Sequence, residues 1–495
     1  MPSEDTISLI KFDGPTTPRS DLTCPVCGSQ RASLTLTVEP TPTEGGKLAL
    51  FACLGCGSYF YGGTEPVIGY DHVGFEPKCW LHYAQVGAGI STMVAPLMSL
   101  GPRGNGSLLD VGCGFGFVPH FWEKSGRGPA VGLESAVYGK LGKELLGVEI
   151  HHEYYNQCHA IAGRKFDIVY AAEVIEHVRD PKAFLLEISQ GLADAGIMII
   201  TTPSATVVAP EADPSTLRTA LSPGFHYFLF SRAALKATFV AAGFSHVVVR
   251  DNGHQLVAWA SRHPFDEPDR ADFDWDKYLN YLERLSQHAD PSVKGGALYR
   301  LFKDSLNTGR SEQARAAFDN LSALALANYA IDFTNPDMGL VLKSSSLISR
   351  LEQSPAWLGG ALLFGGIHIG HTTGDQRAKL RMIDAAIRIF KHDIATSPQF
   401  THEPGHLLPF AEQQYRIGLS EALTMELHAG LGRHVPPGAT APKASLVDGF
   451  VQTLTSLTNA IVASIPAILA KKSRRTVARW ERSIRKRINR WSSKT

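Results

Sequence analysis

The sequence predicts an α/β fold with a doubly wound sheet, preceded by a small cysteine-rich module and followed by an α-helical domain and a basic amphipathic tail. Three observations lead to this prediction. Residues 108–117, LLDVGCGFGF, read as a buried strand that runs into a glycine-rich turn and opens a helix. Apolar, strand-like runs then alternate with helix-length segments as far as residue 262, and two Cys-x-x-Cys pairs come before them. The length of 495 residues suits roughly two to four domains.

The cysteine-rich module spans residues 20–62. Cys24 and Cys27 form one pair, Cys53 and Cys56 form the other, and a glycine follows each pair. The stretch between the pairs alternates like a β-hairpin around a Gly-Gly turn. Four thiolates suit tetrahedral zinc, so we expect a structural zinc ribbon rather than two redox pairs. The remaining cysteines lack ligand spacing and are expected to be buried thiols: Cys79, Cys113 and Cys158.

The glycine-rich turn predicts a site for an adenosine-bearing cofactor. Gly112, Gly114 and Gly116 follow Asp110 with G-x-G-x-G spacing, and Phe117 stands where the dinucleotide fingerprint needs its third glycine. The pattern resembles motif I of the class I methyltransferases, which bind S-adenosylmethionine on a Rossmann-like sheet. The resemblance implies that the turn approaches the methionine half of the cofactor and that Asp110 helps to fix the ammonium group. A tight turn without a ligand is the alternative.

The next two strands are expected to contribute further cofactor contacts. The run PAVGLES is interpreted as a short apolar strand that ends at Glu134, 24 residues after Asp110, where an acidic side chain hydrogen-bonds a ribose diol. The third strand is expected within residues 147–155. The methyltransferase resemblance implies an Asp after this strand that faces the adenine amino group. Glu153 or Asn156 takes its place here, or the contact is absent.

The fourth strand, residues 166–171, leads into Glu173 and His177 within FDIVYAAEVIEHVRDP. This segment resembles the EVIEHV segment of ubiquinone-type and related small-molecule O-methyltransferases, in which the acidic and histidine positions lie beside the reacting centre. His177 is then placed to accept the proton of a substrate hydroxyl, or it only braces the helix. His226 is a second candidate for contact with the substrate. Residues 196–203 are expected to form the fifth strand.

The methyltransferase resemblance covers residues 80–262. At its end, a helix capped by Ser231 and stopped by Gly243 precedes two β-branched closing strands. At its start, residues 80–100 have helical periodicity interrupted by glycines. Tyr83 in this segment either closes over the cofactor, as an aromatic residue often does in this family, or packs in the core.

Residues 275–432 are expected to form an α-helical domain after a charged, proline-containing linker. Apolar positions at 298, 301 and 302, and again at 314 and 318, flank a turn at Gly309 and resemble one tetratricopeptide-type helix pair. His368 and His371 are interpreted as packing or surface residues. By elimination, we expect this domain to dock the substrate or a protein partner.

Residues 449–495 are expected to form an amphipathic helix and then a basic one. Residues 449–470 carry no charge, but scattered polar residues and Pro466 argue against a transmembrane helix. Residues 471–494 contain eleven Lys or Arg and one Glu, opposite a stripe of tryptophan and isoleucine. Such a helix suits an anionic membrane surface. Nucleic acid, which is less favoured, and a self-packing helix are the alternatives.

The composition is that of an ordinary globular protein, and the N-terminus lacks the apolar run of a secretory signal. Four of the seven cysteines are spaced for a metal, which indicates a reducing compartment. We therefore expect a cytoplasmic protein, peripheral on the membrane surface if the tail binds lipid.

A zinc ribbon ahead of this cofactor fold resembles methyltransferases that modify sugars. We therefore expect an S-adenosylmethionine-dependent methyltransferase that acts on a hydroxyl of a small molecule, such as a sugar or a lipid- or nucleotide-linked glycan intermediate. An RNA methyltransferase is the first alternative. Against it, the chain outside residues 471–494 has 37 basic and 46 acidic residues, and no N-P-P-Y-like signature follows the fourth strand. A non-catalytic scaffold that retains the fold is the second alternative.

Overall fold

The computed structural model describes residues 10–13, 18–39, 47–62, 77–86, 89–101, 104–268, 273–396 and 402–434. The chain divides into two units, residues 1–368 with 381–412 and residues 369–380 with 413–495. The tail predicted at residues 449–495 lies outside the described residues. None of the described helices combines the length and the hydropathy needed to cross a bilayer.

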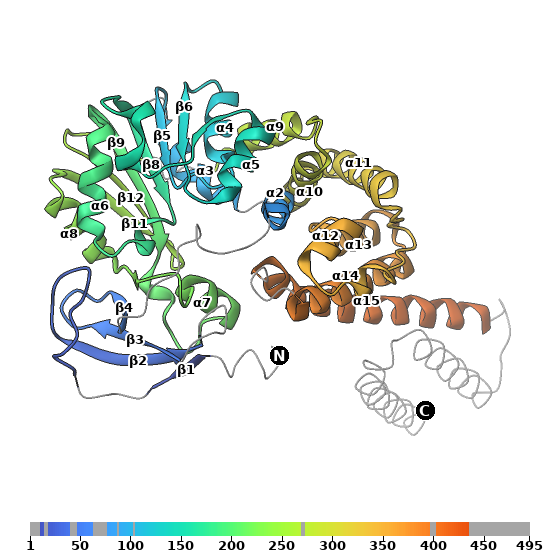
Figure 1. Ribbon diagram of the computed structural model, residues 1–495. Helices are drawn as coiled ribbons and strands as arrows, with labels where there is room; N and C mark the ends of the chain where they lie inside the picture. Colours follow the sequence, from blue (N-terminus) through green and yellow to red (C-terminus); the bar gives the residue numbers. More distant parts are fainter. Residues whose placement is uncertain are drawn as a thin grey trace. The chain divides into compact units, whose positions relative to one another are not determined.

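The N-terminal sheet contains the cysteine module and extends beyond it. Its five antiparallel strands, in spatial order, are β1 (Ile10–Phe12), β2 (Ala32–Val38), β3 (Leu48–Cys53), β4 (Tyr59–Gly62) and β10 (Phe228–Leu229). β2 and β3 form the hairpin predicted between the two cysteine pairs (Figure 1). The predicted limits, residues 20–62, therefore omit one strand at each edge of this sheet.

A mixed seven-stranded sheet forms the centre of the α/β domain (Figure 1). In spatial order its strands are β7 (Glu149–His151), β6 (Ala130–Leu133), β5 (Leu108–Val111), β8 (Phe166–Ala172), β9 (Leu192–Pro203), β12 (Gln255–Ser261) and β11 (His246–Asp251). The first five are parallel, and β12 runs antiparallel to both of its neighbours. The strand order reverses between β5 and β8. In such sheets ligands bind outside the carboxyl ends of the strands at this point.

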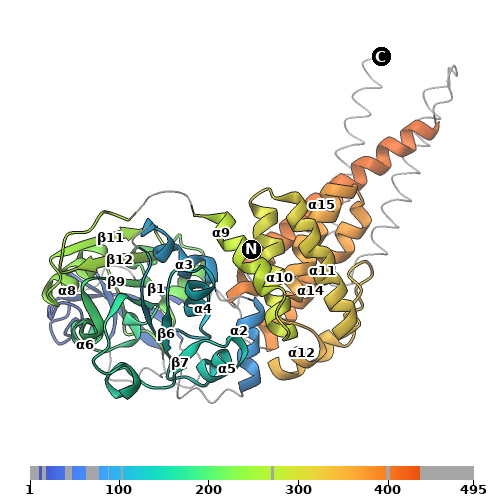
Figure 2. The same ribbon diagram turned by 90° about the horizontal axis from the view of Figure 1, so that it is seen from above.

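Two groups of helices accompany the sheet, as the doubly wound prediction requires (Figures 1 and 2). In one group, α4 (Phe117–Lys124) contacts both α3 (Ile90–Met98) and α5 (Val137–Leu146), and in the other α6 (Pro181–Ile188) contacts α8 (Arg232–Ala241). Ser231 caps α8 by accepting a hydrogen bond from the Ala234 amide (3.1 Å), and Gly243 follows the helix with φ of 90°, both as predicted.

The segment before β5 is helical but interrupted, as its glycines indicate. It contains the 3-10 helix η2 (Pro77–Trp80), α2 (Leu81–Val86) and α3, and Gly89 adopts a left-handed conformation immediately before α3. A further helix, α7 (Pro214–Leu221), lies between β9 and β10 in the chain.

The C-terminal part is helical, as predicted. Its helices are α9 (Trp275–Leu285), α10 (Pro291–Asn307), α11 (Ser311–Tyr329), α12 (Leu347–Gln353), α13 (Leu358–Thr373), α14 (Gln376–Thr396) and α15 (His402–His434). α10 and α11 pack together across the turn at Gly309, and the ring centroids of Phe302 and Phe318 lie 5.0 Å apart. His368 is buried against these two rings and His371 is exposed, so both are packing or surface residues as predicted.

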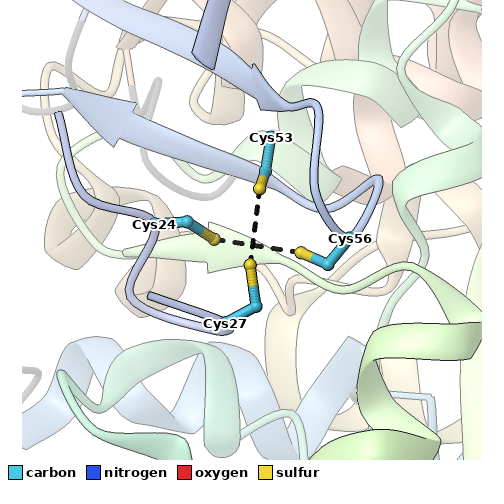
Figure 3. Close-up of side chains that lie close together, drawn as sticks. All are labelled: Cys24, Cys27, Cys53 and Cys56. Carbon is cyan, nitrogen blue, oxygen red and sulfur yellow. Dashed lines mark hydrogen bonds between the residues drawn. The ribbon is translucent and has the colours of Figure 1, made fainter. Parts of the chain in front are cut away.

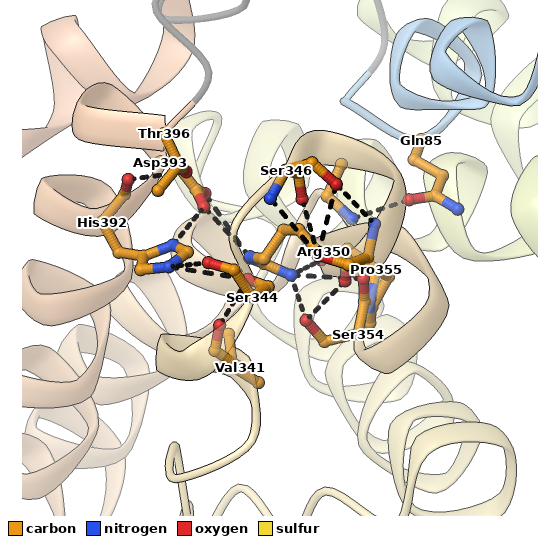
Figure 4. Close-up of polar contacts among 12 residues, drawn as sticks. Gln85, Val341, Ser344, Ser346, Arg350, Ser354, Pro355, His392, Asp393 and Thr396 are labelled. Carbon is orange, nitrogen blue, oxygen red and sulfur yellow. Dashed lines mark hydrogen bonds and ion pairs between the residues drawn. The ribbon is translucent and has the colours of Figure 1, made fainter. Parts of the chain in front are cut away.

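Arg350 is the centre of a buried polar network in the first unit (Figure 4). Its Nε donates to Oδ1 of Asp393 (3.0 Å), and its Nη1 donates to the Ser354 carbonyl (3.2 Å). Beside this network, the Gln85 side chain of α2 accepts a hydrogen bond from the Ala356 amide (2.6 Å) and donates to Oγ of Ser292 (3.2 Å). The helical region therefore holds α2 through buried hydrogen bonds.

Within the second unit, the described residues are 369–380 and 413–434. Nζ of Lys379, a buried side chain, donates to Oε2 of Glu421 (2.8 Å). A Cβ on Gly418 would lie 3.2 Å from Cδ2 of Leu380, so these helix segments pack closely.

Candidate active site

The glycine turn after β5 has a backbone that only glycine adopts easily. Gly112, Gly114 and Gly116 have φ of 73°, 59° and 87°, and the left-handed region costs other residues about 1–2 kcal/mol each. A Cβ on Gly112 would lie 2.5 Å from Cγ2 of Val174, and one on Gly116 would lie 2.7 Å from Cδ1 of Ile150. The turn is therefore pressed against the segment that follows β8 and against β7.

Two buried carboxylates lie beside this turn, at the ends of β5 and β6. Asp110 is 2% exposed and Glu134 is 7% exposed. Oε2 of Glu134 accepts a hydrogen bond from the Gly114 amide (2.9 Å), and Oε1 accepts one from the Ala136 amide (2.8 Å). Burial, and then the charge of Glu134, raise the pKa of Asp110 well above its usual value. A cationic group or a diol bound here would relieve this electrostatic cost.

Tyr83 approaches the turn through a second aromatic residue. Its ring stacks on Tyr138 with centroids 6.3 Å apart, and Trp80 lies on the same ring with centroids 4.5 Å apart. A Cβ on Gly114 would lie 3.8 Å from Cε2 of Tyr138. Tyr138, at the second position of α5, is thus an aromatic neighbour of the turn that the sequence did not single out.

The two candidates for the adenine contact follow β7. Glu153 and Asn156 are both exposed. The side-chain positions do not select between them, so both stay candidates.

Glu173 lies immediately after β8 and has a left-handed backbone with φ of 55°. Its Oε1 accepts hydrogen bonds from Oγ1 of Thr201 (2.8 Å) and from Nε2 of Gln255 (2.8 Å). Burial raises the pKa of this carboxyl group. These bonds fix Glu173 to β9 and β12, at the carboxyl edge of the sheet where the glycine turn also lies.

The structure brings His177 and His226 together, although they are 49 positions apart in the chain. Their ring centroids lie 4.6 Å apart. Nδ1 of His177 lies 3.0 Å from the Phe225 carbonyl, and Nδ1 of His226 lies 2.8 Å from the Ala220 carbonyl. A carbonyl only accepts, so we assign the proton to each Nδ1, which leaves a lone pair on each Nε2.

Both histidines are neutral in this environment. Burial lowers the pKa of His177 to about 4. Burial, and then the proximity of His177, lower the pKa of His226 well below its usual value. A neutral imidazole with a lone pair on Nε2 can accept a proton or bind a metal ion.

Glu176 completes this cluster and was not among the predicted site residues. It is fully buried, and its Oε2 accepts a hydrogen bond from Oγ1 of Thr202 (2.9 Å). Its Oε1 has no hydrogen-bond partner among the described residues and lies 3.9 Å from Nε2 of His226. Burial, and then the charge of Glu173, raise its pKa. The signal in the sequence is the second acidic residue of EVIEH, three positions after Glu173.

Glu176, His177 and His226 offer ligand atoms that all lie within 4.8 Å of one another. An imidazole ligand in a metal site usually donates its other ring N–H to a carbonyl or carboxylate, and both histidines do so here. The donor set, with its unpaired buried carboxylate oxygen, fits a divalent cation.

Residues 82–249 match the family model of a methyltransferase domain. This segment contains the glycine turn, the EVIEH segment and His226, and it lies within the predicted limits of residues 80–262. The chain therefore contains a methyltransferase domain, and the predicted α/β fold with its S-adenosylmethionine-type glycine turn agrees with this match.

Similar proteins carry related names. A ubiquinone biosynthesis O-methyltransferase from Cereibacter sphaeroides (strain ATCC 17029) is 36% identical over 115 residues, which are 22% of this chain and 44% of that protein. One from Azorhizobium caulinodans is 33% identical over 114 residues, which are 22% of this chain and 45% of that protein. The chain thus spans less than half the length of these relatives.

Among solved structures, an S-adenosylmethionine-dependent methyltransferase from Aquifex aeolicus is 18% identical. The similarity covers 38% of this chain and 98% of that one, with a TM-score of 0.30. The fold assignment rests on the strand order described above.

The four cysteines predicted to bind zinc converge N-terminal to the methyltransferase domain (Figure 3). Sγ of Cys24 lies 3.9 Å from Sγ of Cys56, and Sγ of Cys27 lies 3.5 Å from Sγ of Cys53. A hydrogen bond with Cys24 lowers the pKa of Cys56 to about 4, so a thiolate is favoured. Four sulfurs in this arrangement fit tetrahedral zinc. The other cysteines are buried thiols as predicted: Cys79, Cys113 and Cys158.

Proposed function

We propose that this chain is an S-adenosylmethionine-dependent O-methyltransferase. The observation that carries the proposal is the packing of the glycine turn against the EVIEH segment, through Gly112 and Val174. A methyl donor bound at the turn would lie beside the segment that carries Glu176 and His177. The methyltransferase domain match over residues 82–249 supports the same activity.

We propose that the turn and its two carboxylates hold the methyl donor. In this proposal the main chain of Gly112, Gly114 and Gly116 approaches the methionine half. Asp110 binds the ammonium group, because a cation offsets the cost of its burial. Glu134 binds the ribose diol, and Tyr83 contributes to an aromatic wall through Tyr138.

Methyl transfer to oxygen requires alignment and a proton acceptor. The acceptor oxygen attacks the methyl carbon in line, the new C–O bond forms as the C–S bond of the sulfonium breaks, and the hydroxyl proton leaves. We propose that Nε2 of His226 or His177 takes this proton, since both imidazoles are neutral and are oriented by carbonyls. Glu173 holds the segment in place through Thr201 and Gln255.

A second arrangement of the acceptor side is supported by the unpaired Oε1 of Glu176. We propose that Glu176, His177 and His226 hold a divalent cation. When bound, such a cation lowers the pKa of a coordinated hydroxyl group. Two of these ligands, His177 and His226, are the residues that would otherwise accept the proton directly, so a test for metal binding distinguishes the two arrangements.

We propose a hydroxyl on a small molecule as the methyl acceptor, and a sugar or a lipid- or nucleotide-linked glycan intermediate as its class. The names of the relatives support a hydroxyl acceptor. The four-cysteine module ahead of the methyltransferase domain supports the carbohydrate class, because it resembles that of sugar methyltransferases. RNA as the acceptor, or no acceptor at all in a scaffold, are the competing outcomes.

Two measurements on the full chain test this function. Calorimetry with S-adenosylmethionine should show one binding site per chain. Asp110→Asn should lower the affinity of this site for S-adenosylmethionine. Labelled methyl transfer into fractionated cell extract should place the label in a glycan or small-molecule fraction, and His226→Gln should bind the donor without transferring. Absence of binding to folded wild-type protein would remove the proposal, whereas label in RNA would favour the first alternative.

We also propose that the four cysteines bind one structural zinc ion. Zinc analysis should give one equivalent per chain at the cysteines, and Cys53→Ser should lose it with a large loss of stability. Less zinc than chains in reduced wild-type protein, or unchanged stability in the variant, would contradict the proposal.

For residues 471–495 we propose binding to an anionic membrane surface, and for the helical domain a docking role toward the substrate or a protein partner. The full chain should float with vesicles that contain phosphatidylserine more than a chain that ends at Ala470. Equal flotation would exclude the membrane proposal, and binding to RNA instead would favour nucleic acid.

A further inference from the structure

The sheet of the four-cysteine module is continuous with the chain segment that carries His226. β10 begins two residues after His226 and pairs with β4, with Phe228 opposite Phe60 and Leu229 opposite Tyr59. Next to the first pair, the Tyr61 amide donates to the Tyr227 carbonyl (3.1 Å). The Tyr227 amide in turn donates to the Glu176 carbonyl (2.8 Å). Tyr227 therefore links the module to Glu176 through two main-chain hydrogen bonds, one to Tyr61 and one to Glu176.

The second cysteine pair is bonded directly to the methyltransferase domain. Oγ of Ser231 donates to the Cys56 carbonyl (2.6 Å), and the Ser231 amide donates to Oγ of Ser58 (3.0 Å). Ser58 is fully buried. Since Ser231 also caps α8, the conformation of the loop that carries Cys56 is coupled to the end of the segment after His226.

The carbonyl that orients His226 also rests on the module. This carbonyl belongs to Ala220, near the end of α7, and lies 2.8 Å from Nδ1 of His226. α7 packs on the N-terminal sheet in one hydrophobic cluster, whose buried members are Leu36, Val38, Leu50, Val207, Val208, Leu217, Ala220, Leu221 and Leu229. In addition, the Tyr61 hydroxyl of β4 donates to the Leu221 carbonyl (3.0 Å).

The proposed donor site is held differently. The amides of Gly112 and Cys113 both donate to the Leu133 carbonyl at the end of β6 (2.8 and 3.0 Å), and Glu134 accepts from the Gly114 amide. The parallel strands of the central sheet thus support the donor side, while the N-terminal sheet supports the acceptor side.

We infer that the four-cysteine module is the positioning element of His226. By ordering the loop at Cys56 and strand β4, a metal ion at the cysteines sets the position of β10 and α7, and these set the direction of the His226 imidazole toward Glu176. The inference rests on the proposed function only in the role it gives to His226. It states that loss of the metal disorders the acceptor side and spares the donor side.

The test observes His226 itself and needs no methyl acceptor. In full-length protein with isotopically labelled histidine, the ring-nitrogen resonances of His226 are assigned by their loss in His226→Gln. Cys56→Ser, and treatment of wild-type protein with a zinc chelator, should shift and broaden these resonances. The dissociation constant for S-adenosylmethionine, from calorimetry, should change by no more than about twofold.

Milder variants separate positioning from unfolding of the module. Tyr61→Phe removes only the hydroxyl that bonds the Leu221 carbonyl, and Ser231→Ala removes the bond to Cys56. Both should displace the His226 resonances in the same direction as Cys56→Ser but by less. The matched control is Ser346→Ala, which removes a serine cap of the same kind from α12, and it should leave the resonances in place.

Two results would overturn the inference. One is a set of His226 resonances that stay unchanged in Tyr61→Phe, Ser231→Ala and metal-free protein. The other is an equal loss of donor affinity in these variants, which would mean general unfolding of the domain. Should wild-type protein fail to bind S-adenosylmethionine, the proposed function falls, but the resonances still decide whether the module positions His226.

Discussion

The guanidinium of Arg300 lies over the ring of Phe117, with Cζ 5.0 Å from the ring centroid. Phe117 is the first residue of α4 and directly follows the last glycine of the turn, whereas Arg300 belongs to α10 of the helical region. Arg300 is 3% exposed and also donates to the Ala84 carbonyl of α2. One buried cation therefore joins the helical region to two helices beside the proposed donor site.

We expect Arg300→Met to destabilise the protein and to weaken donor binding. The variant loses a charged hydrogen bond and a buried cation–π contact. It also removes the desolvation cost of the Arg300 Nε and Nη1 atoms, which are buried without a hydrogen-bond partner among the described residues. The net loss in free energy of unfolding should be about 1–3 kcal/mol. Urea titration measures the stability, and calorimetry measures the affinity for S-adenosylmethionine.

The matched control for Arg300→Met is Arg164→Met. Arg164 also lies over a ring, that of Phe166, at 5.1 Å, but its side chain is 42% exposed. It should affect stability little and leave donor affinity unchanged. If Arg300→Met also leaves the affinity unchanged, the helical region does not support the donor site.

A second prediction concerns the contact between the glycine turn and the EVIEH segment. In Gly112→Ala, a Cβ must enter a left-handed conformation and also displace Val174 from a distance of 2.5 Å. We expect donor affinity to fall by about tenfold or more. Gly126→Ala is the control, because Gly126 has nearly the same φ (70°) with no atom within 4 Å of its Cβ position.

Gly126→Ala should cost only the backbone term, about 1–2 kcal/mol of stability, with donor affinity retained. Comparing the donor affinities of the two variants thus separates the effect of the clash with Val174 from that of the strained left-handed backbone. Equal donor affinity in both would show that Val174 moves aside without affecting the site.

A third prediction is a pH dependence of stability from His120 on α4. It is 6% exposed, its Nδ1 lies 2.9 Å from the Tyr281 hydroxyl of α9, and burial, then the charges of Lys124 and His288, lower its pKa to about 4. Above an unfolded-state pKa of about 6.5 both states are neutral. Between there and pH 4 the unfolded state binds the proton first, so stability falls as the pH falls.

The loss attributable to His120 should approach about 3 kcal/mol at pH 4 and then level off. The measurement is the free energy of unfolding of wild type and of His120→Gln at several pH values, since glutamine retains a partner for Tyr281. As the pH falls from about 6.5 to 4, the difference in free energy of unfolding between wild type and His120→Gln should narrow or change sign. A difference that is constant from pH 7 to pH 4 would contradict the burial of a neutral His120.

The sequence predicted those features whose signals are local. The strands, the glycine-rich turn, the Ser231 cap and the α10–α11 pair all depend on residues within one turn, one element or two consecutive elements. The four cysteines could be grouped because each pair has the spacing of a metal-binding knuckle. The pairing of His226 with His177 was expected only to the extent that both were candidates for the substrate side.

Features that depend on distant pairing were beyond such reasoning. β10 has two residues and no strand pattern of its own, and it exists because β4 supplies a partner edge. Glu176 reads like any acidic residue in a loop until folding buries it beside His226. The cation–π contact of Arg300 likewise joins residues 183 positions apart, as the numbering of Phe117 and Arg300 shows.

The last prediction concerns Glu176 and separates the two acceptor-side arrangements. We expect reduced, full-length protein to retain one divalent cation beyond the zinc at the cysteines after dialysis against Mn²⁺ and then metal-free buffer. Glu176→Gln should lose it while keeping the bond from Thr202, because an amide oxygen without charge is a poor replacement for a buried carboxylate ligand. Elemental analysis gives the number of metal ions per chain, and the electron paramagnetic resonance spectrum of Mn²⁺ shows whether the ion is bound. Glu187→Gln on α6, which changes an acidic residue outside the cluster, should retain the ion.

If wild-type protein does not retain this second cation, the arrangement in which a neutral histidine accepts the proton is the one that stands. Methyl transfer should then continue in the presence of a chelator that leaves the metal at the cysteines in place.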